Sequence, residues 1–466
     1  METWADDRAL VGRRIRSAGR FRLLTSSRAT LPAVSLAAAL VAVAGTIGPD
    51  ARWLAVLGRS IDRLGGVLHG IPYAAASSTG WHNVPVLAEL IFRGLETSLG
   101  DRGLLGAQLV AAVVAMLFVV RDARRLGATD DGIAAAVVVV LIAGLLAFAG
   151  IRAQLFSLAL FPALLWLLRS EEDEASRRIW LLVPLVALWS NLHGTVLVGV
   201  GLALLYLLIE RAPRRPLESL AVAGASLLAL CATPALAETP RYYAGVLGNE
   251  AARRGYGLWA PLSVHSGFDL LLVAGAAVLL VGFIRSRPRA WQIVGAAALA
   301  LLTVDAARNG IWLLLFLAPP AAAAIRISAR PPAGVSHALA LLFAAAAVAG
   351  LVRGPLVVGA SSHLVANAIT DARGRPILAD PAVAEQIAQA GGRVWIANPL
   401  DAFRRSDQLL YLDWLQGRPS GDRVLRGEDI VVVLHGSKAA QRLVHDPRFA
   451  RVAADAKGEL FVRASP

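Results

Sequence analysis

The composition of this 466-residue chain excludes an ordinary soluble protein. Hydrophobic residues make up 56% of the sequence and charged residues only 17%, whereas soluble domains carry roughly 25% charged residues. Mean hydropathy is +0.59, and apolar runs of about 20 residues, long enough to cross a bilayer, recur along the chain. The net charge of +13 does not indicate nucleic-acid binding, because the arginines cluster in short segments between apolar runs. The single cysteine, Cys231, excludes an intrachain disulfide.

The apolar runs predict a polytopic α-helical membrane protein with eleven spans. The run at 179–210 is too long for one ordinary span, and the polar group Ser190-Asn191-Leu192-His193-Gly194 in its middle predicts a tight reversal. The predicted spans are 31–48, 103–120, 131–149, 153–169, 179–192, 194–210, 218–234, 268–284, 290–304, 310–327 and 335–352.

The arginines predict the orientation of these spans. Seven of them lie in residues 1–30, which are therefore expected to form a basic cytoplasmic segment, and every second short loop after it is arginine-rich. Eleven spans then place the N-terminus inside and the C-terminus outside. A cleaved signal peptide ending near Ala42-Val43-Ala44 is the alternative for the first run, and it is disfavoured because a basic leader of this length is unusual.

The first outside loop, residues 49–102, is too apolar for a solvated loop. Segments 51–64 and 84–98 have helical spacing and are expected to lie along the membrane interface. The loop contains two acids of interest, Asp50 at the outer end of the first span and Glu89.

Polar residues at the outer reversals are the candidates for binding. Arginine is unfavourable on the outer side by the positive-inside rule, so an outer arginine suggests a phosphate clamp rather than a topology signal. Asparagine and histidine within an apolar stretch are costly unless they face a cavity or a partner. These candidates are Arg152, Gln154, Asn191, His193, Trp259, His265 and Arg308.

Residues 353–466 are more polar and predict a small α/β domain outside the membrane. Buried strands are expected at 392–396 and 429–434, and amphipathic helices at 380–390 and 437–445.

Several motifs resemble the GT-C superfamily of integral-membrane glycosyltransferases, and more closely a largely uncharacterised bacterial branch of it. The chain offers Asp50 after the first span and a loop running from Gly58 to Pro72. It also has three longer matches, Arg152-Ala153-Gln154-Leu155-Phe156-Ser157, Trp189-Ser190-Asn191-Leu192-His193-Gly194 and Arg308-Asn309-Gly310-Ile311-Trp312. The resemblance implies a GT-C-like domain at 31–352, a location in the cell (inner) membrane, and transfer of a sugar from a polyprenyl-phosphate donor to an extracytoplasmic acceptor.

The same resemblance implies roles for the candidate residues. Asp50, or failing it Glu89, would be the general base, while Arg152, Arg308 and the histidine would stabilise the departing phosphate. Gln154, Asn191 and His193 would position donor or acceptor, with Trp259 and His265 as further binding residues. Relatives have an acid where this chain has Ala74-Ala75. A divalent metal cofactor is therefore possible but has no support from the sequence. The alternatives are a non-catalytic scaffold of GT-C type and, less favoured, a lipid or polymer transporter.

Overall fold

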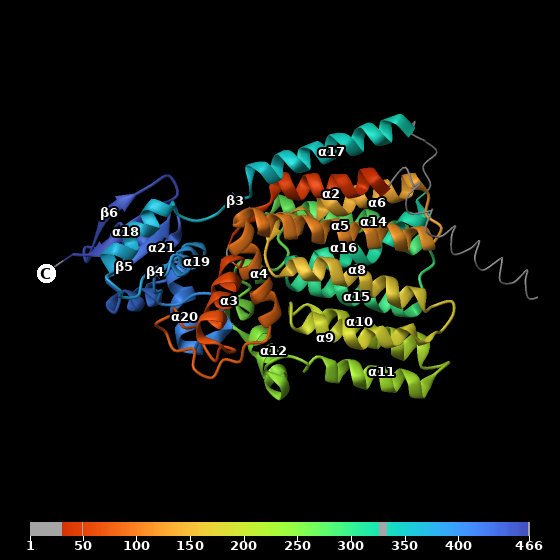
Figure 1. Ribbon diagram of the computed structural model, residues 1–466, viewed down its shortest axis with the longest axis horizontal. Helices are drawn as coiled ribbons and strands as arrows, with labels where there is room; N and C mark the ends of the chain where they lie inside the picture. Colours follow the sequence, from red (N-terminus) through yellow and green to blue (C-terminus); the bar gives the residue numbers. More distant parts are fainter. Residues whose placement is uncertain (1–29, 49, 326–332, 465–466) are drawn as a thin grey trace, which may run out of the picture.

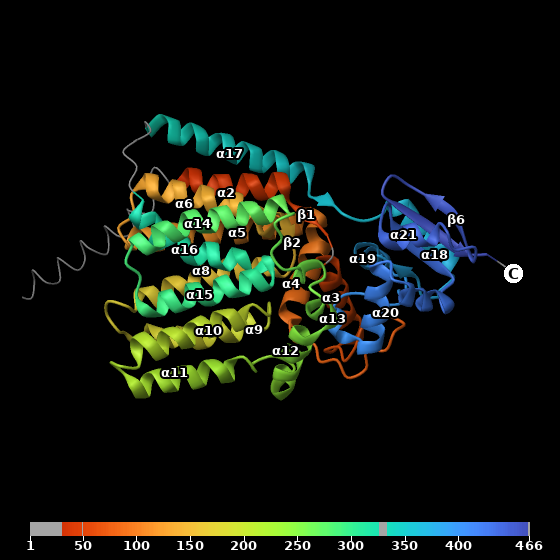
Figure 2. The ribbon, with the colours of Figure 1, turned by 180° about the vertical axis from the view of Figure 1, so that it is seen from behind.

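The computed structural model describes residues 30–48, 50–325 and 333–464. A bundle of roughly parallel helices forms the larger part, and a C-terminal lobe of residues 356–464 lies beyond one end of it (Figure 1). The basic segment expected at residues 1–30 lies almost wholly outside the described residues. Figure 2 shows the same arrangement from behind.

The bundle helices follow the predicted apolar runs. Helix α6 stops at Ala143, because Gly144 interrupts the predicted segment 131–149, and a short helix α7 follows. Three helices, Asp101–Arg125, Gly267–Arg285 and Gly334–Arg353, are long and apolar enough to cross a membrane, and several apolar helices are shorter. The bundle comprises α2 (Thr30–Ala44), α5 (Asp101–Arg125), α6 (Asp130–Ala143), α7 (Leu145–Ala149), α8 (Gln154–Ser170), α9 (Leu182–Ser190), α10 (Val196–Tyr206), α11 (Pro216–Ala229), α14 (Gly267–Arg285), α15 (Ala290–Asp305), α16 (Gly310–Ala324) and α17 (Ala333–Arg353).

Helix α16 is the centre of the bundle. Every residue from Gly310 to Ala322 is buried, as expected for a helix that is apolar all round. Small residues let its neighbours approach closely. A Cβ added at Gly282 of α14 would lie 2.8 Å from the Ala321 Cβ, and one at Gly132 of α6 would lie 2.3 Å from the Ala322 carbonyl oxygen.

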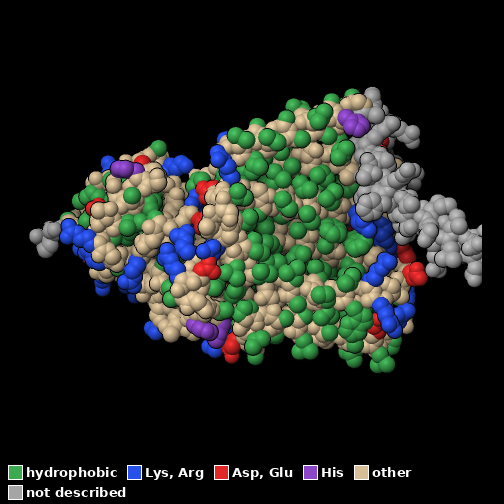
Figure 3. Space-filling view, in the orientation of Figure 1, with side chains coloured by type: hydrophobic (Ala, Val, Ile, Leu, Met, Phe, Trp, Pro, Cys, Tyr) green, Lys and Arg blue, Asp and Glu red, His purple; other side chains and the backbone are tan. Residues whose placement is uncertain are grey.

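Buried ion pairs hold together the end of the bundle that faces away from the lobe. Arg169 of α8 donates to Asp122 of α5 at 2.5 Å, and Arg211 donates to Glu171 at 2.9 Å. These residues belong to the arginine-rich loops predicted to be cytoplasmic, and charged side chains gather at this end in the space-filling view (Figure 3). Pairing is what makes such buried charges tolerable.

The first loop lies across the opposite end of the bundle. Helices α3 (Arg52–Leu64) and α4 (Val86–Leu99) match the two predicted amphipathic segments. They lie between the bundle and the lobe, together with α12 (Thr239–Gly248) and α13 (Glu250–Arg253) (Figure 2). Gly58 permits the close crossing of α3 and α4, since a Cβ there would lie 2.4 Å from the Glu89 carbonyl oxygen.

The C-terminal lobe is a four-stranded sheet covered by helices. The strand order is β4-β5-β7-β6, with β4 (Leu378–Ala379) parallel to β5 (Ile430–Leu434), and β5 and β6 (Phe449–Ala454) antiparallel to β7 (Gly458–Arg463). The helices are α18 (Ser362–Ala372), α19 (Pro381–Gln389), α20 (Arg405–Leu415) and α21 (Lys438–Leu443).

The strand expected at 392–396 does not form. Only Val394 pairs, through single parallel bridges to Ile377 on one side and to Ala74 of the first loop on the other. The Ala75 and Ala76 amides donate to the carbonyl oxygens of Val394 and Trp395, each at 2.8 Å. The first loop therefore extends the edge of the lobe, and its backbone groups find their hydrogen-bond partners there.

Candidate active site

A small parallel sheet brings the end of the first helix next to the turn between α7 and α8. Strand β1 (Thr46–Ile47) pairs with β2 (Gly150–Ile151) on one side and β3 (Leu356–Val357) on the other. Parallel strands end at the same edge, so Asp50, soon after β1, and Arg152, directly after β2, emerge together. Burial raises the pKa of Asp50, and the charges of Arg152 and, more weakly, of Arg308 oppose this shift.

Arg308 joins this pair from a third turn, Ala307–Asn309, between α15 and α16. Its guanidinium carbon lies 3.8 Å from the ring centroid of Trp259, a cation–π distance. Burial and the charge of Arg152 lower the pKa of Arg308 to about 10, while Asp50 opposes the shift. The Ala307 amide donates to the Ala260 carbonyl at 3.0 Å, which ties this turn to the segment that carries Trp259.

The two arginines leave the cluster with an excess of positive charge. Neither forms an ion pair within 4.0 Å with an acid among the described residues, and the buried Nε of Arg152 has no hydrogen-bond partner there. Of the acids in the described part of the chain, Asp50 is the one whose charge acts on both arginines. Two guanidinium groups sharing one carboxylate can hold an anion, and their fixed donors suit phosphate oxygens.

His193 completes the cluster from the turn between α9 and α10. Its Nδ1 lies 2.9 Å from the Ser157 hydroxyl and accepts the Thr195 amide hydrogen at 3.3 Å. Burial and the two arginines lower its pKa to about 3, so the ring is neutral near pH 7. Because Nδ1 accepts, the proton lies on Nε2, which is then a donor.

Asn191 is occupied in holding the turn. Its side-chain amide donates to the carbonyl oxygens of Ala187 and Ala232, at 2.8 and 2.7 Å, and its backbone carbonyl accepts the Ala88 amide hydrogen of α4. The Asn191 amide nitrogen is therefore used to fix the turn that carries His193 and does not face the arginines. Gln154, the first residue of α8, is buried two residues after Arg152.

Two predicted site residues lie apart from the cluster. Glu89 is fully buried in α4. Burial raises its pKa to about 8, and a 2.7 Å hydrogen bond donated by Asn83 opposes this shift. No interaction within the described part of the chain joins it to Arg152 or Arg308. His265 is exposed and lies in sequence between Ser263 and Ser266, which both line the cavity described below.

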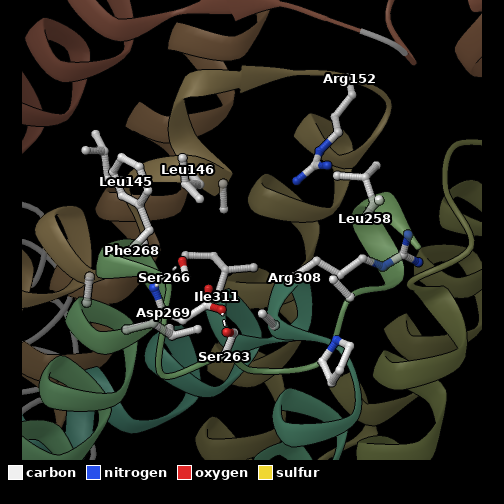
Figure 4. A pocket seen from close by; sticks show the side chains of 18 residues that line it. Leu145, Leu146, Arg152, Leu258, Ser263, Ser266, Phe268, Asp269, Arg308 and Ile311 are labelled. Atoms are coloured by element: carbon white, nitrogen blue, oxygen red, sulfur yellow. Dashed lines mark hydrogen bonds between the residues drawn. The ribbon is translucent and has the colours of Figure 1, made fainter. Parts of the chain in front are cut away.

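A cavity of about 370 Å³ adjoins the two arginines (Figure 4). Arg152 and Arg308 form part of its lining, with Ser263, Ser266 and Asp269 as the other polar side chains. The rest of the wall is mainly apolar and comes from α7, α14, α16 and the segment before α14, with Leu145, Leu146, Leu258, Phe268, Leu272 and Ile311 as its larger side chains. A cavity with cations and an apolar wall suits an amphiphile with an anionic head.

Two residues that contact Asp50 were not predicted from the sequence. Asn398 of the lobe donates through Nδ2 to Asp50 Oδ1 at 3.1 Å and to Glu385 Oε1 at 2.8 Å. Glu385 in turn accepts the Asp50 amide hydrogen at 2.7 Å. Asn398 and Glu385 both lie more than 330 positions after Asp50 in the sequence, in a region predicted to form a separate domain. Within the described residues, no group of three or more His, Cys, Asp or Glu side chains is arranged to hold a metal ion.

The comparisons with known proteins bear on the fold. No protein-family model matches the chain, and no curated protein matches it in sequence. Among solved structures, ArnT from Cupriavidus metallidurans bound to undecaprenyl phosphate aligns over 93% of this chain and 97% of its own, with a TM-score of 0.51 and 13% identity. Two cryo-EM structures of a mutant arabinofuranosyltransferase AftD from mycobacteria align over 92% and 94% of this chain, with TM-scores of 0.51 and 0.50 and identities of 14% and 18%.

The chain has a GT-C-like fold. This confirms the GT-C-like fold that the motifs around Arg152 and His193 suggested, while the eleven spans and their orientation stay predictions. The chain spans about two-fifths of AftD, 41% of its length, and nearly all of ArnT. At these identities the GT-C-like fold is what the likeness establishes, so the chemistry has to be argued from the residues of the site.

Proposed function

We propose that this protein is a membrane glycosyltransferase that moves a sugar from a polyprenyl-phosphate donor to an extracytoplasmic acceptor. The observation that carries the proposal is the pair of half-buried arginines, Arg152 and Arg308, whose charges both act on Asp50 and which line a cavity with a largely apolar wall. That ArnT, a protein of similar fold, binds undecaprenyl phosphate supports this class of donor.

The cluster suits the charge that develops as the donor is cleaved. Asp50 takes the proton of the acceptor hydroxyl, whose oxygen attacks the anomeric carbon and inverts it. The bond from that carbon to the phosphate oxygen breaks, and its electron pair leaves with the polyprenyl phosphate. Arg152, Arg308 and the Nε2 hydrogen of His193 stabilise the leaving phosphate. Burial raises the pKa of Asp50, which strengthens it as a base.

The distribution of charge supports a location at the outer face of the cell (inner) membrane. Charged side chains gather at the end of the bundle remote from the lobe (Figure 3), while β1 and β2, which Asp50 and Arg152 follow in the chain, lie at the end next to the lobe (Figure 2). By the positive-inside rule the remote end faces the cytoplasm. The acceptor is then a component of the cell envelope.

Binding of undecaprenyl phosphate, measured by native mass spectrometry of the purified protein, tests the proposal. Arg152→Ala and Arg308→Ala should each weaken binding by about tenfold or more, because each loses a charged hydrogen bond in a poorly solvated site. Arg241→Ala, an exposed arginine of α12, is the matched control and should bind normally. Asp50→Asn should bind at least as tightly as the unmodified protein, since it removes the one negative charge beside both arginines.

Equal binding by the unmodified protein and by both arginine variants would contradict the proposal. So would an absence of binding by the unmodified protein, which is the outcome that a non-catalytic scaffold predicts.

A further inference from the structure

Two side chains of the C-terminal lobe meet the first loop at the proposed base. Glu385 lies on α19 and is 1% exposed, and Asn398 lies on a loop beside it. The Asn398 amide bridges the two carboxyl groups, with 3.1 Å to Asp50 Oδ1 and 2.8 Å to Glu385 Oε1. A second link is the 2.7 Å hydrogen bond from the Asp50 amide to Glu385 Oε1.

Glu385 also holds the start of α3. Its Oε2 accepts the backbone amide hydrogens of Arg52 and Trp53, at 3.1 and 3.3 Å. These are amides of the first helical turn, which have no partner within a helix, and a carboxyl oxygen supplies the acceptor that they lack. Ala51, which precedes α3, offers no side-chain cap of its own.

The location of its hydrogen-bond partners indicates the role of Glu385. Apart from Asn398, all its described hydrogen-bond partners belong to the first loop. A buried acid that served only the lobe would find its partners within the lobe, because burying a carboxyl group is costly unless it is paired. Asp50 itself has a φ of 95°, in the left-handed region that is unfavourable for residues other than glycine, so its conformation depends on such contacts.

We infer that Glu385 and Asn398 are positioning residues for Asp50, so that the C-terminal lobe completes the catalytic site. The inference rests on the proposed function, in which Asp50 is the base. Asn398 holds Oδ1 and leaves Oδ2 to take the acceptor's proton, while Glu385 fixes the backbone from which the carboxylate projects. Reaction rates are sensitive to such placement, and a shift of about 1 Å can lower turnover by roughly 100-fold.

A double-mutant cycle on the full chain in nanodiscs tests this role, with a polyprenyl-phosphate-linked sugar that the unmodified protein turns over. Glu385→Gln keeps the volume of the side chain but replaces one acceptor oxygen with an amide NH2 group, which can only donate. It should lower kcat by on the order of 100-fold and change the donor KM by no more than a few-fold. In an Asp50→Asn background it should have no further effect, because a residue that acts through the base has nothing left to position.

Controls separate positioning from folding. Glu428→Gln alters another buried acid of the lobe. No interaction among the residues that the structure describes joins it to Asp50, so this variant should leave kcat unchanged. Asn398→Ala should also lower kcat, and, like Glu385→Gln, it should cause no further loss of kcat in the Asp50→Asn background. Undecaprenyl phosphate binding, which depends on the arginines, should be retained in all of these variants.

The inference is overturned if Glu385→Gln leaves kcat within twofold, or if it lowers turnover by the same factor with and without Asp50. Failure of the proposed function looks different. In that case the unmodified protein turns over no polyprenyl-phosphate-linked sugar, or Arg152→Ala binds undecaprenyl phosphate normally, and this inference falls with it.

Discussion

At the scale of single residues, the site depends on half-buried charges that do not balance one another. Arg152 and Arg308 come from turns more than 150 positions apart, and Asp50 from a third. The outer arginines were predictable, because they oppose the rule that sets topology. Glu385 and Asn398 were not, because no periodicity or spacing relates a lobe residue to one that is 335 positions away.

His193 should act as a neutral donor over the whole physiological range. Its pKa is lowered to about 3, chiefly by burial and further by Arg308 and Arg152. Undecaprenyl phosphate binding should therefore show no step near pH 6.5 that depends on this residue. His193→Ala should weaken binding by about tenfold at every pH from 5 to 8, since a hydrogen bond to a charged group is lost. A step near pH 6.5 that disappears in His193→Ala would show that the ring titrates, and would contradict this account.

Glu89 should make the protein less stable as the pH rises. Burial raises its pKa to about 8 from an ordinary value of 4.5, so the folded state holds a proton that the unfolded state releases. The free energy of unfolding should then fall between about pH 4.5 and 8. Glu89→Gln mimics the protonated form, so its melting temperature should rise relative to the unmodified protein as the pH increases. Glu238→Gln, at a partly exposed position, is the control, and a pH-independent difference for Glu89→Gln would contradict the prediction.

At the scale of elements, amphipathic and apolar periodicity predicted most helices, including α3 and α4, because burial of one face or of all faces is written locally in the sequence. The prediction of a strand at 392–396 was wrong. Its apolar residues are buried, but only Val394 finds pairing partners, and one of them, Ala74, comes from the first loop. Sequence patterns report burial and leave open which edge a segment pairs with.

The crossing of α3 and α4 provides a direct test at this scale. Gly58→Ala would place a Cβ 2.4 Å from the Glu89 carbonyl oxygen, so we expect a destabilisation of about 1–3 kcal/mol and reduced turnover as Asp50 shifts with α3. Gly94, in α4, has open space around it, so Gly94→Ala should be neutral or slightly stabilising because alanine favours helix. Thermal unfolding in detergent measures both, and equal melting temperatures would contradict the packing described.

At the scale of the whole molecule, the bundle separates two kinds of charge. Ion-paired arginines hold one end, and the unbalanced pair lies at the other. Reporter fusions test the predicted sides. A fusion at Ala360 should be active only with an exported enzyme, and one in the turn after α14, at Arg287, only with a cytoplasmic reporter. The opposite pattern would move the site to the cytoplasmic side and exclude an extracytoplasmic acceptor.

The central claim is that Asp50 is the base of a transfer from a polyprenyl-phosphate-linked sugar. Turnover of a labelled donor of this kind, measured beside donor binding, tests it most directly. Asp50→Asn keeps the shape of the side chain and removes the proton acceptor, so transfer should fall by about 10²–10⁴-fold while the donor still binds. Unchanged transfer by Asp50→Asn would remove this residue from the mechanism and contradict the account.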